Sequence, residues 1–263
     1  MRELIAIEYA KLKKFHALKI IFGVYMLAVP GWMYFMNFFF KLEPGLKALF
    51  TSDNPFDFPH IWSYITFSAS FFNILLAVII VVLTTNDFQY KTMRQNIIDG
   101  MSKQKVILSK FLLVFFLSSI ASIYTFLVGL VIGLLESTTF DWYQNFHLIV
   151  LYFVQTLGYF SFAFLFAIVV KRPAIAIVSF ILYFPVETIL GKIISSEAYQ
   201  VFPLKVFADL TPMPFFKAIL ASAKDKSGQM PWILDTDIRI ILSLVYVFLF
   251  FFLSYYLLKK KDL

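Results

Sequence analysis

Few residues of this chain are of the types that carry enzyme chemistry, and those few are scattered. The three histidines, His16, His60 and His147, are far apart in the sequence, and the chain contains no cysteine. Metal centres and activated nucleophiles need such groups in recognisable sets. The sequence also lacks a phosphate-binding loop of the form Gly-x-x-x-x-Gly-Lys-[Ser/Thr]. We therefore expect no catalytic residue, no metal site and no cofactor in this chain, and we expect that it is not an enzyme.

One carboxylate, Glu187, lies deep in an apolar segment. About 14 residues, or about 21 Å of helix, separate it from the start of that segment at Pro173. A charge in a bilayer costs a few kcal/mol unless it faces protein or water. Glu187 is therefore a candidate gating group or part of a substrate path. The alternative is a structural role, in which it pairs with Thr188, Lys192 or an amide of the following loop.

A polar stretch between two long apolar segments is the second feature that could carry function. It runs from Asn86 to Lys103. If it is helical, one of its faces is apolar and is formed by Tyr90, Met93 and Ile97. Gly100 is expected to end this helix, and Ser102 to cap the next one. Such a helix could receive force from a soluble motor, or it could simply rest on the lipid surface.

The elements that position these residues are membrane spans. Hydrophobic residues make up 60% of the chain, 34 residues are phenylalanine, and the mean hydropathy is +0.81. About 20 apolar residues cross a bilayer as a helix. We therefore expect an all-α polytopic membrane protein that forms a single membrane domain over residues 1–263. Its six spans are predicted at 17–40, 61–85, 111–135, 146–170, 173–190 and 238–258.

Alternate connections between these spans are rich in lysine and arginine, and the basic connections of membrane proteins face the cytoplasm. The basic segments are 1–16, the loop 86–110, the turn at Lys171 and Arg172, and the C-terminal end. Both termini and the 86–110 loop are thus predicted to be cytoplasmic, in a bacterial plasma or inner membrane. Segment 1–16 is predicted to be an amphipathic helix at the interface. The outer loop 191–237 is predicted to hold short helices that dip into the outer leaflet or cap a cavity.

With this topology, the chain resembles the permease subunits of type-2 ABC transporters of the exporter type. The resemblance is carried by Asp87, Lys91-Thr92-Met93-Arg94-Gln95-Asn96, Gly100-Met101-Ser102-Lys103, Lys110 and the N-terminal Glu8-Tyr9-Ala10-Lys11-Leu12-Lys13-Lys14. It implies a coupling helix that docks on an ATPase through Tyr90, Thr92, Met93, Arg94, Ile97, Gly100 and Ser102. It also implies an N-terminal connecting helix that includes Glu8, Lys11 and Leu12.

The resemblance further implies the partners of the chain. A separate P-loop ATPase would carry ATP and Mg, a second permease would complete a homo- or heterodimer, and the lipid bilayer would surround both. We expect no nucleic-acid partner. Two other functions stay open, namely a secondary transporter or channel that works alone and a membrane component that transmits force without transport. The former typically has ionisable groups at the midplane and repeated halves, of which the sequence offers only Glu187 and no repeat.

Overall fold

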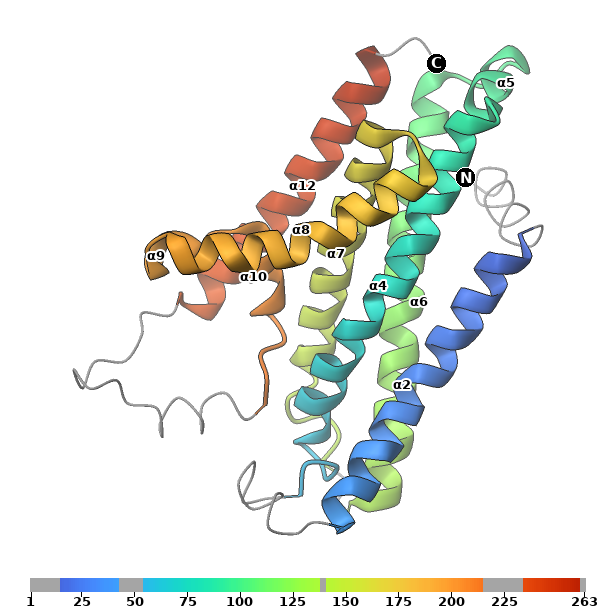
Figure 1. Ribbon diagram of the computed structural model, residues 1–263. Coiled ribbons are helices and arrows are strands. Elements are labelled where there is room, and N and C mark those ends of the chain that lie inside the picture. Colours follow the sequence, from blue (N-terminus) through green and yellow to red (C-terminus); the bar gives the residue numbers. More distant parts are fainter. Residues whose placement is uncertain (1–14, 43–53, 138–140, 215–233, 261–263) are drawn as a thin grey trace.

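A computed structural model describes residues 15–42, 54–137, 141–214 and 234–260. All regular secondary structure in these ranges is helical (Figure 1). The expected all-α architecture is confirmed. The helices are α2 (His16–Leu42), α4 (Ile61–Gln89), α5 (Thr92–Ile98), α6 (Lys103–Glu136), α7 (His147–Val170), α8 (Pro173–Ile193), α9 (Ser196–Tyr199), α10 (Pro203–Ala208) and α12 (Thr236–Lys260).

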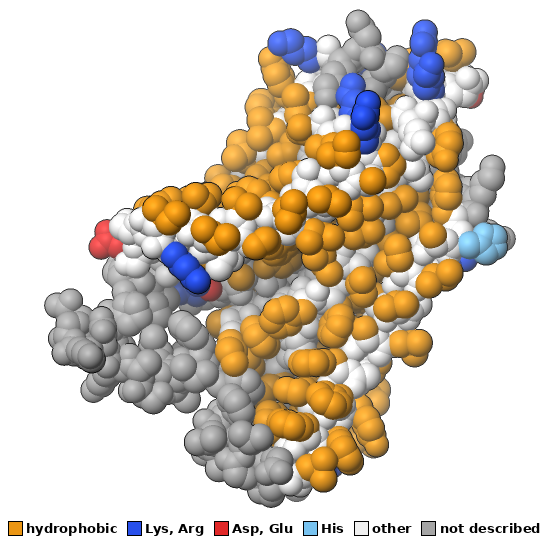
Figure 2. Space-filling model, viewed as in Figure 1, with side chains coloured by type: hydrophobic (Ala, Val, Ile, Leu, Met, Phe, Trp, Pro, Cys, Tyr) orange, Lys and Arg blue, Asp and Glu red, His pale blue; other side chains and the backbone are white. Residues whose placement is uncertain are grey.

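Six of these helices, α2, α4, α6, α7, α8 and α12, are long and apolar enough to cross a membrane. They correspond to the six predicted spans. Apolar side chains also dominate the outer surface seen in Figure 2, which suits a surface that faces lipid rather than water. The chain is therefore a multi-pass membrane protein. The predicted interfacial helix at 1–16 lies almost wholly outside the described residues.

Helices α4 and α7 pack against each other at the centre and are the most buried of the six. Helix α6 packs closely on α4 because Gly129 leaves room for an aromatic side chain. A Cβ atom built at Gly129 would lie 2.9 Å from the ring of Trp62. Trp62 in turn stacks on Phe126 with 5.6 Å between ring centroids. Gly133, four residues further on, likewise lies against the ring of Phe58, so the Gly-x-x-x-Gly motif formed by Gly129 and Gly133 serves packing within the chain.

A buried hydrogen-bond network connects α2, α4 and α7. The Asn73 amide donates to the Thr156 hydroxyl at 3.0 Å, and the Tyr152 hydroxyl donates to the Asn73 carbonyl oxygen at 2.8 Å. The hydroxyls of Tyr152 and Tyr25 are 3.5 Å apart. Polar groups in an apolar bundle need partners of this kind. The network fixes the rotation of the three helices relative to one another.

Helix α8 departs from the arrangement of the other five long helices. It runs across the bundle rather than along it, and α9 and α10 follow at its far end (Figure 1). It is also the least buried of the six. Helix α10 returns to contact α7 and α12. At this contact the ring of Phe207 lies against Gly158, where any Cβ atom would collide with it.

Basic residues gather at one end of the molecule. This end holds α5, the last turn of α12 and the turn between α7 and α8 (Figures 1 and 2). Its lysines and arginines include Lys91, Arg94, Lys103, Lys105, Lys171, Arg172, Lys259 and Lys260. The basic connections that alternate along the sequence therefore lie together at one end of the structure.

Candidate functional site: the α5 segment and a cavity beside α8

The chain reverses direction twice around α5, and local backbone chemistry sets both turns. Lys91 adopts a left-handed conformation with φ of 54° and begins α5 directly after α4. At the other end Gly100 has φ of 96°, which glycine adopts without strain. The Met101 amide donates to the Asn96 carbonyl at 2.9 Å, and the Gly100 amide donates to the Ile97 carbonyl at 3.1 Å. These two bonds form a Schellman motif.

The next helix, α6, begins as the sequence predicts. The Ser102 hydroxyl oxygen accepts a hydrogen bond from the Lys105 amide at 3.4 Å, which is N-capping geometry. The predictions for Gly100 and Ser102 are thus confirmed.

A buried polar cluster ties α5 to the two spans beside it. Asp87 lies at the end of α4, Thr92 begins α5, and Lys110 lies two turns into α6. The Thr92 hydroxyl donates to Asp87 Oδ1 at 2.5 Å, and the Lys110 ammonium forms an ion pair with Asp87 Oδ2. The side chains of Asp87 and Lys110 are only 4% and 1% exposed. We call Asp87, Thr92 and Lys110 the anchor cluster.

The two sides of α5 differ from the simple apolar face that the sequence predicts. Met93 is 3% exposed and packs into the core of the chain, with Ile97 partly buried beside it. Tyr90 precedes the helix and is 61% exposed, and Ile98 is 68% exposed. The predicted face therefore divides, because Met93 and Ile97 attach α5 to the membrane bundle while Tyr90 points away from it. A partner would meet Tyr90 and Ile98 rather than Met93.

The remaining predicted residues of this segment are accessible. Arg94, Gly100 and Ser102 are exposed, and Thr92 is half-buried in the anchor cluster. Glu8, Lys11 and Leu12 of the predicted connecting helix lie outside the described residues.

Glu187 has the loop-amide partner that the sequence left open beside a gating role. Its side chain is buried, and its two oxygens accept hydrogen bonds from backbone amides at the start of α10. The Lys205 amide is 2.8 Å from Oε1, and the Leu204 amide is 3.3 Å from Oε2. A carboxylate satisfies such free amides at a helix start well. The prediction of a loop-amide partner is therefore confirmed, and the bonds hold α10 against α8.

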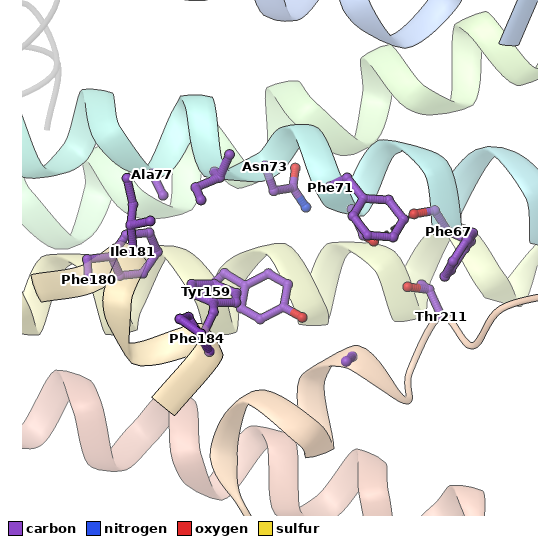
Figure 3. A pocket seen from close by; sticks show the side chains of 13 residues that line it. Phe67, Phe71, Asn73, Ala77, Tyr159, Phe180, Ile181, Phe184 and Thr211 are labelled. Atoms are coloured by element: carbon purple, nitrogen blue, oxygen red, sulfur yellow. Dashed lines mark hydrogen bonds between the residues drawn. The ribbon is translucent and has the colours of Figure 1, made fainter. Parts of the chain in front are cut away.

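A cavity of about 440 Å³ lies between α4, α7, α8 and the segment that follows α10 (Figure 3). Its walls include Asn73, Tyr159, Phe184 and Thr211. The Thr211 hydroxyl donates to Gln155 Oε1 at 2.8 Å, which ties the segment after α10 to α7. Among the described residues, no group of three or more potential ligands could hold a metal ion.

Comparison with known proteins gives a family but no activity. The family model described as "Protein of unknown function (DUF2705)" matches residues 20–263. A comparison with curated proteins gave no match.

Proposed function

The chain belongs to this family, and we propose that it is the membrane-spanning permease subunit of an ATP-driven exporter of the type-2 ABC class. In this role it forms a translocation path and receives force from a separate P-loop ATPase through α5. A second permease, identical or related, completes the membrane part, and ATP and Mg bind on the ATPase subunits. The complex would lie in a bacterial plasma or inner membrane.

The observation that carries this proposal is the attachment of α5 to both neighbouring spans. A helix that transmits force must not move independently of the helices it drives. The anchor cluster links α4, α5 and α6 through a buried ion pair and a short hydrogen bond. Breaking a buried ion pair on one side costs about 3–5 kcal/mol. A push on α5 is therefore passed to α4 and α6 together.

The outer surface of α5 suits a protein partner. Tyr90 and Ile98 offer exposed apolar area, while Lys91, Arg94 and Gln95 are exposed around them. Interfaces commonly combine an apolar anchor with charged residues at the rim. The complementary surface on the ATPase would be an apolar cleft with an acidic edge, because α5 presents lysine and arginine.

The experiment is a pull-down of the tagged chain from its own host in mild detergent. The parent is compared with a Tyr90→Asp/Ile98→Asp double variant, which adds two negative charges to exposed positions on the docking surface. Lys260→Glu is the matched control, since it changes the charge by the same amount at the same end of the molecule but on α12. We expect a P-loop ATPase to co-purify with the parent and with Lys260→Glu, and to be lost from the double variant.

Three results would change the proposal. If no P-loop ATPase co-purifies with the parent even after crosslinking, the proposal fails and a transporter that works alone becomes the better hypothesis. If an ATPase co-purifies equally with all three proteins, α5 is not the docking helix. A purified complex that hydrolyses ATP in liposomes without moving any solute would favour force transmission over transport.

A further inference from the structure

The cavity beside α8 has the size of a small-molecule site and lies at mid-depth in the bundle. Its volume of about 440 Å³ falls within the range of ligand pockets, roughly 300–1,000 Å³. One of its wall residues, Asn73, is about 18 Å along α4 from Ile61, at 1.5 Å per residue. A ligand here would therefore sit near the middle of the membrane.

One end of the cavity is apolar, and the other combines polar groups with the rings of Phe67 and Phe71. Figure 3 places Ala77, Phe180 and Ile181 together at one end. The same view places Thr211 toward the opposite end and shows the Tyr159 hydroxyl pointing to that side, with Asn73 between the ends. Such a gradient matches a molecule that has an alkyl chain and a polar group.

The polar groups at the cavity retain unused hydrogen-bonding capacity. Asn73 uses one amide hydrogen for Thr156, and its second amide hydrogen is left for another acceptor. The Thr211 hydroxyl donates to Gln155, so its oxygen can still accept a bond. A hydroxyl or an amide N–H and C=O pair, which can donate as well as accept, could satisfy both. None of the thirteen described wall residues has a charged side chain, so an ionic group in the cavity would lack a partner.

The cavity also reaches the surface that faces lipid. Two of its wall residues, Phe71 and Ile181, are 62% and 40% exposed. They belong to α4 and α8, which both have the length and apolarity of membrane spans. A molecule already dissolved in the bilayer could therefore enter sideways without crossing water.

We propose that this cavity is a binding site for a single-chain amphiphile with an uncharged, hydrogen-bonding headgroup. The alkyl chain lies against Phe180, Ile181 and Ala77, and the headgroup lies near Asn73 and Thr211. The site is a property of the isolated chain and does not depend on an ATPase. Its failure would therefore leave the proposed coupling through α5 untouched, and the reverse also holds.

The test uses a monoacylglycerol with a photoreactive diazirine in its acyl chain. It is added in trace amounts to the purified chain in phosphatidylcholine nanodiscs, and mass spectrometry maps the labelled residues. We expect labelling at α8 residues 180–184 to fall at least fivefold when excess unlabelled monoacylglycerol is added. Labelling of the lipid-facing surface of α2 should fall much less. Lysophosphatidylcholine of equal chain length should compete at least fivefold less well, because its headgroup is charged.

Two variants that fill the cavity provide a second measurement. Ala208→Phe extends from α10, where Ala208 is an exposed wall residue, and Ser70→Phe extends from the opposite wall on α4. Ala174→Phe is the matched control, since Ala174 is exposed on α8 and does not line the cavity. The filling variants should lose the displaceable labelling, whereas Ala174→Phe should keep it. Melting curves identify any variant that fails to fold, and the competition in the parent protein is decisive without them.

Three outcomes would overturn the inference. One is labelling at 180–184 that excess ligand does not displace, or that persists in both folded filling variants. Another is equal competition by lysophosphatidylcholine, which would remove the headgroup assignment. The last is coverage of the cavity by a second copy of the chain. Because the chain has no cysteine of its own, a Phe71→Cys variant that forms disulfide-linked dimers in membranes would reveal this directly.

Discussion

Asp87 and Lys110 are opposite charges in a buried position, where either charge would be unfavourable without the other. Both side chains are almost fully buried, and the Asp87 carboxylate also accepts a hydrogen bond from the Thr92 hydroxyl. The desolvation cost of two buried charges can cancel much of their attraction, so such a pair stabilises a fold only weakly. Its main effect is geometric, because the pair allows few arrangements of α4, α5 and α6. This is the property that transmission of force requires.

Replacing Lys110 by methionine removes one charge and leaves Asp87 buried without its ion-pair partner. We expect Lys110→Met to lower the free energy of unfolding by about 3 kcal/mol or more. The double variant Asp87→Asn/Lys110→Met removes both charges and should recover most of this loss. Thermal unfolding in detergent measures both, with the exposed Lys103→Met as control. If the double variant is no more stable than Lys110→Met, the ion pair is not the source of the effect.

Glu187 acts through the backbone of α10 rather than through another side chain. Glu187→Gln keeps the shape but offers a donor group where one amide needs an acceptor. Hydrogen bonds to charged groups contribute about 1.5–3 kcal/mol. Hydrogen exchange at the Leu204 and Lys205 amides should therefore speed up on the order of tenfold or more. Glu197→Gln changes an exposed residue of α9 and should leave exchange at both amides unchanged.

At the scale of elements, the sequence predicts α5 well in extent and less well in orientation. Gly100 and Ser102 are local signals, and the structure uses both as expected. Periodicity also identifies Met93 and Ile97 as one face, but it does not say what covers that face. The cover comes from the chain's own bundle, whose packing depends on residues far away in sequence. For this reason the resemblance implied a docking role for Met93, whereas its side chain packs in the core of the chain.

The cavity could not be predicted for a related reason. Tyr159 on α7, Phe184 on α8 and Thr211 after α10 are ordinary residues of apolar or loop segments in the sequence. They meet only because α8 runs across the bundle and α10 turns back toward α7. Six spans follow from composition and length, whereas the direction of one span follows from tertiary contacts. The Glu187 bonds to α10 are among those contacts.

Because Met93 and Ile98 lie on different sides of α5, replacing each of them by alanine should affect stability and ATPase binding differently. Met93→Ala should lower the free energy of unfolding by about 2–5 kcal/mol, because it empties a packed core position. Ile98→Ala changes an exposed side chain and should alter stability by no more than about 0.5 kcal/mol. Only Ile98→Ala should weaken ATPase co-purification while the protein remains stable. Equal stability losses would mean that both residues are packed inside.

At the scale of the whole molecule, charge gathers at the end where α5 lies. Lysine and arginine from α5, α6, the turn before α8 and the end of α12 all lie there (Figure 2). Loops of this composition remain on the cytoplasmic side during insertion. The opposite end carries the turn between α6 and α7, which includes Asp141 and Gln144 (Figure 1). The positive-inside rule therefore predicts that the proposed docking surface lies on the side where a soluble ATPase with ATP would be.

This orientation can be tested with single cysteines because the chain has none. Gln95→Cys on α5 and Lys260→Cys on α12 should react with a membrane-impermeant maleimide only after the cells are permeabilised. Gln144→Cys should react in intact spheroplasts, since it is exposed at the opposite end. Labelling of all three after permeabilisation shows that each cysteine is accessible. If Gln95→Cys reacts in intact spheroplasts, α5 faces outward, and a cytoplasmic ATPase could not reach it whatever the shape of its surface.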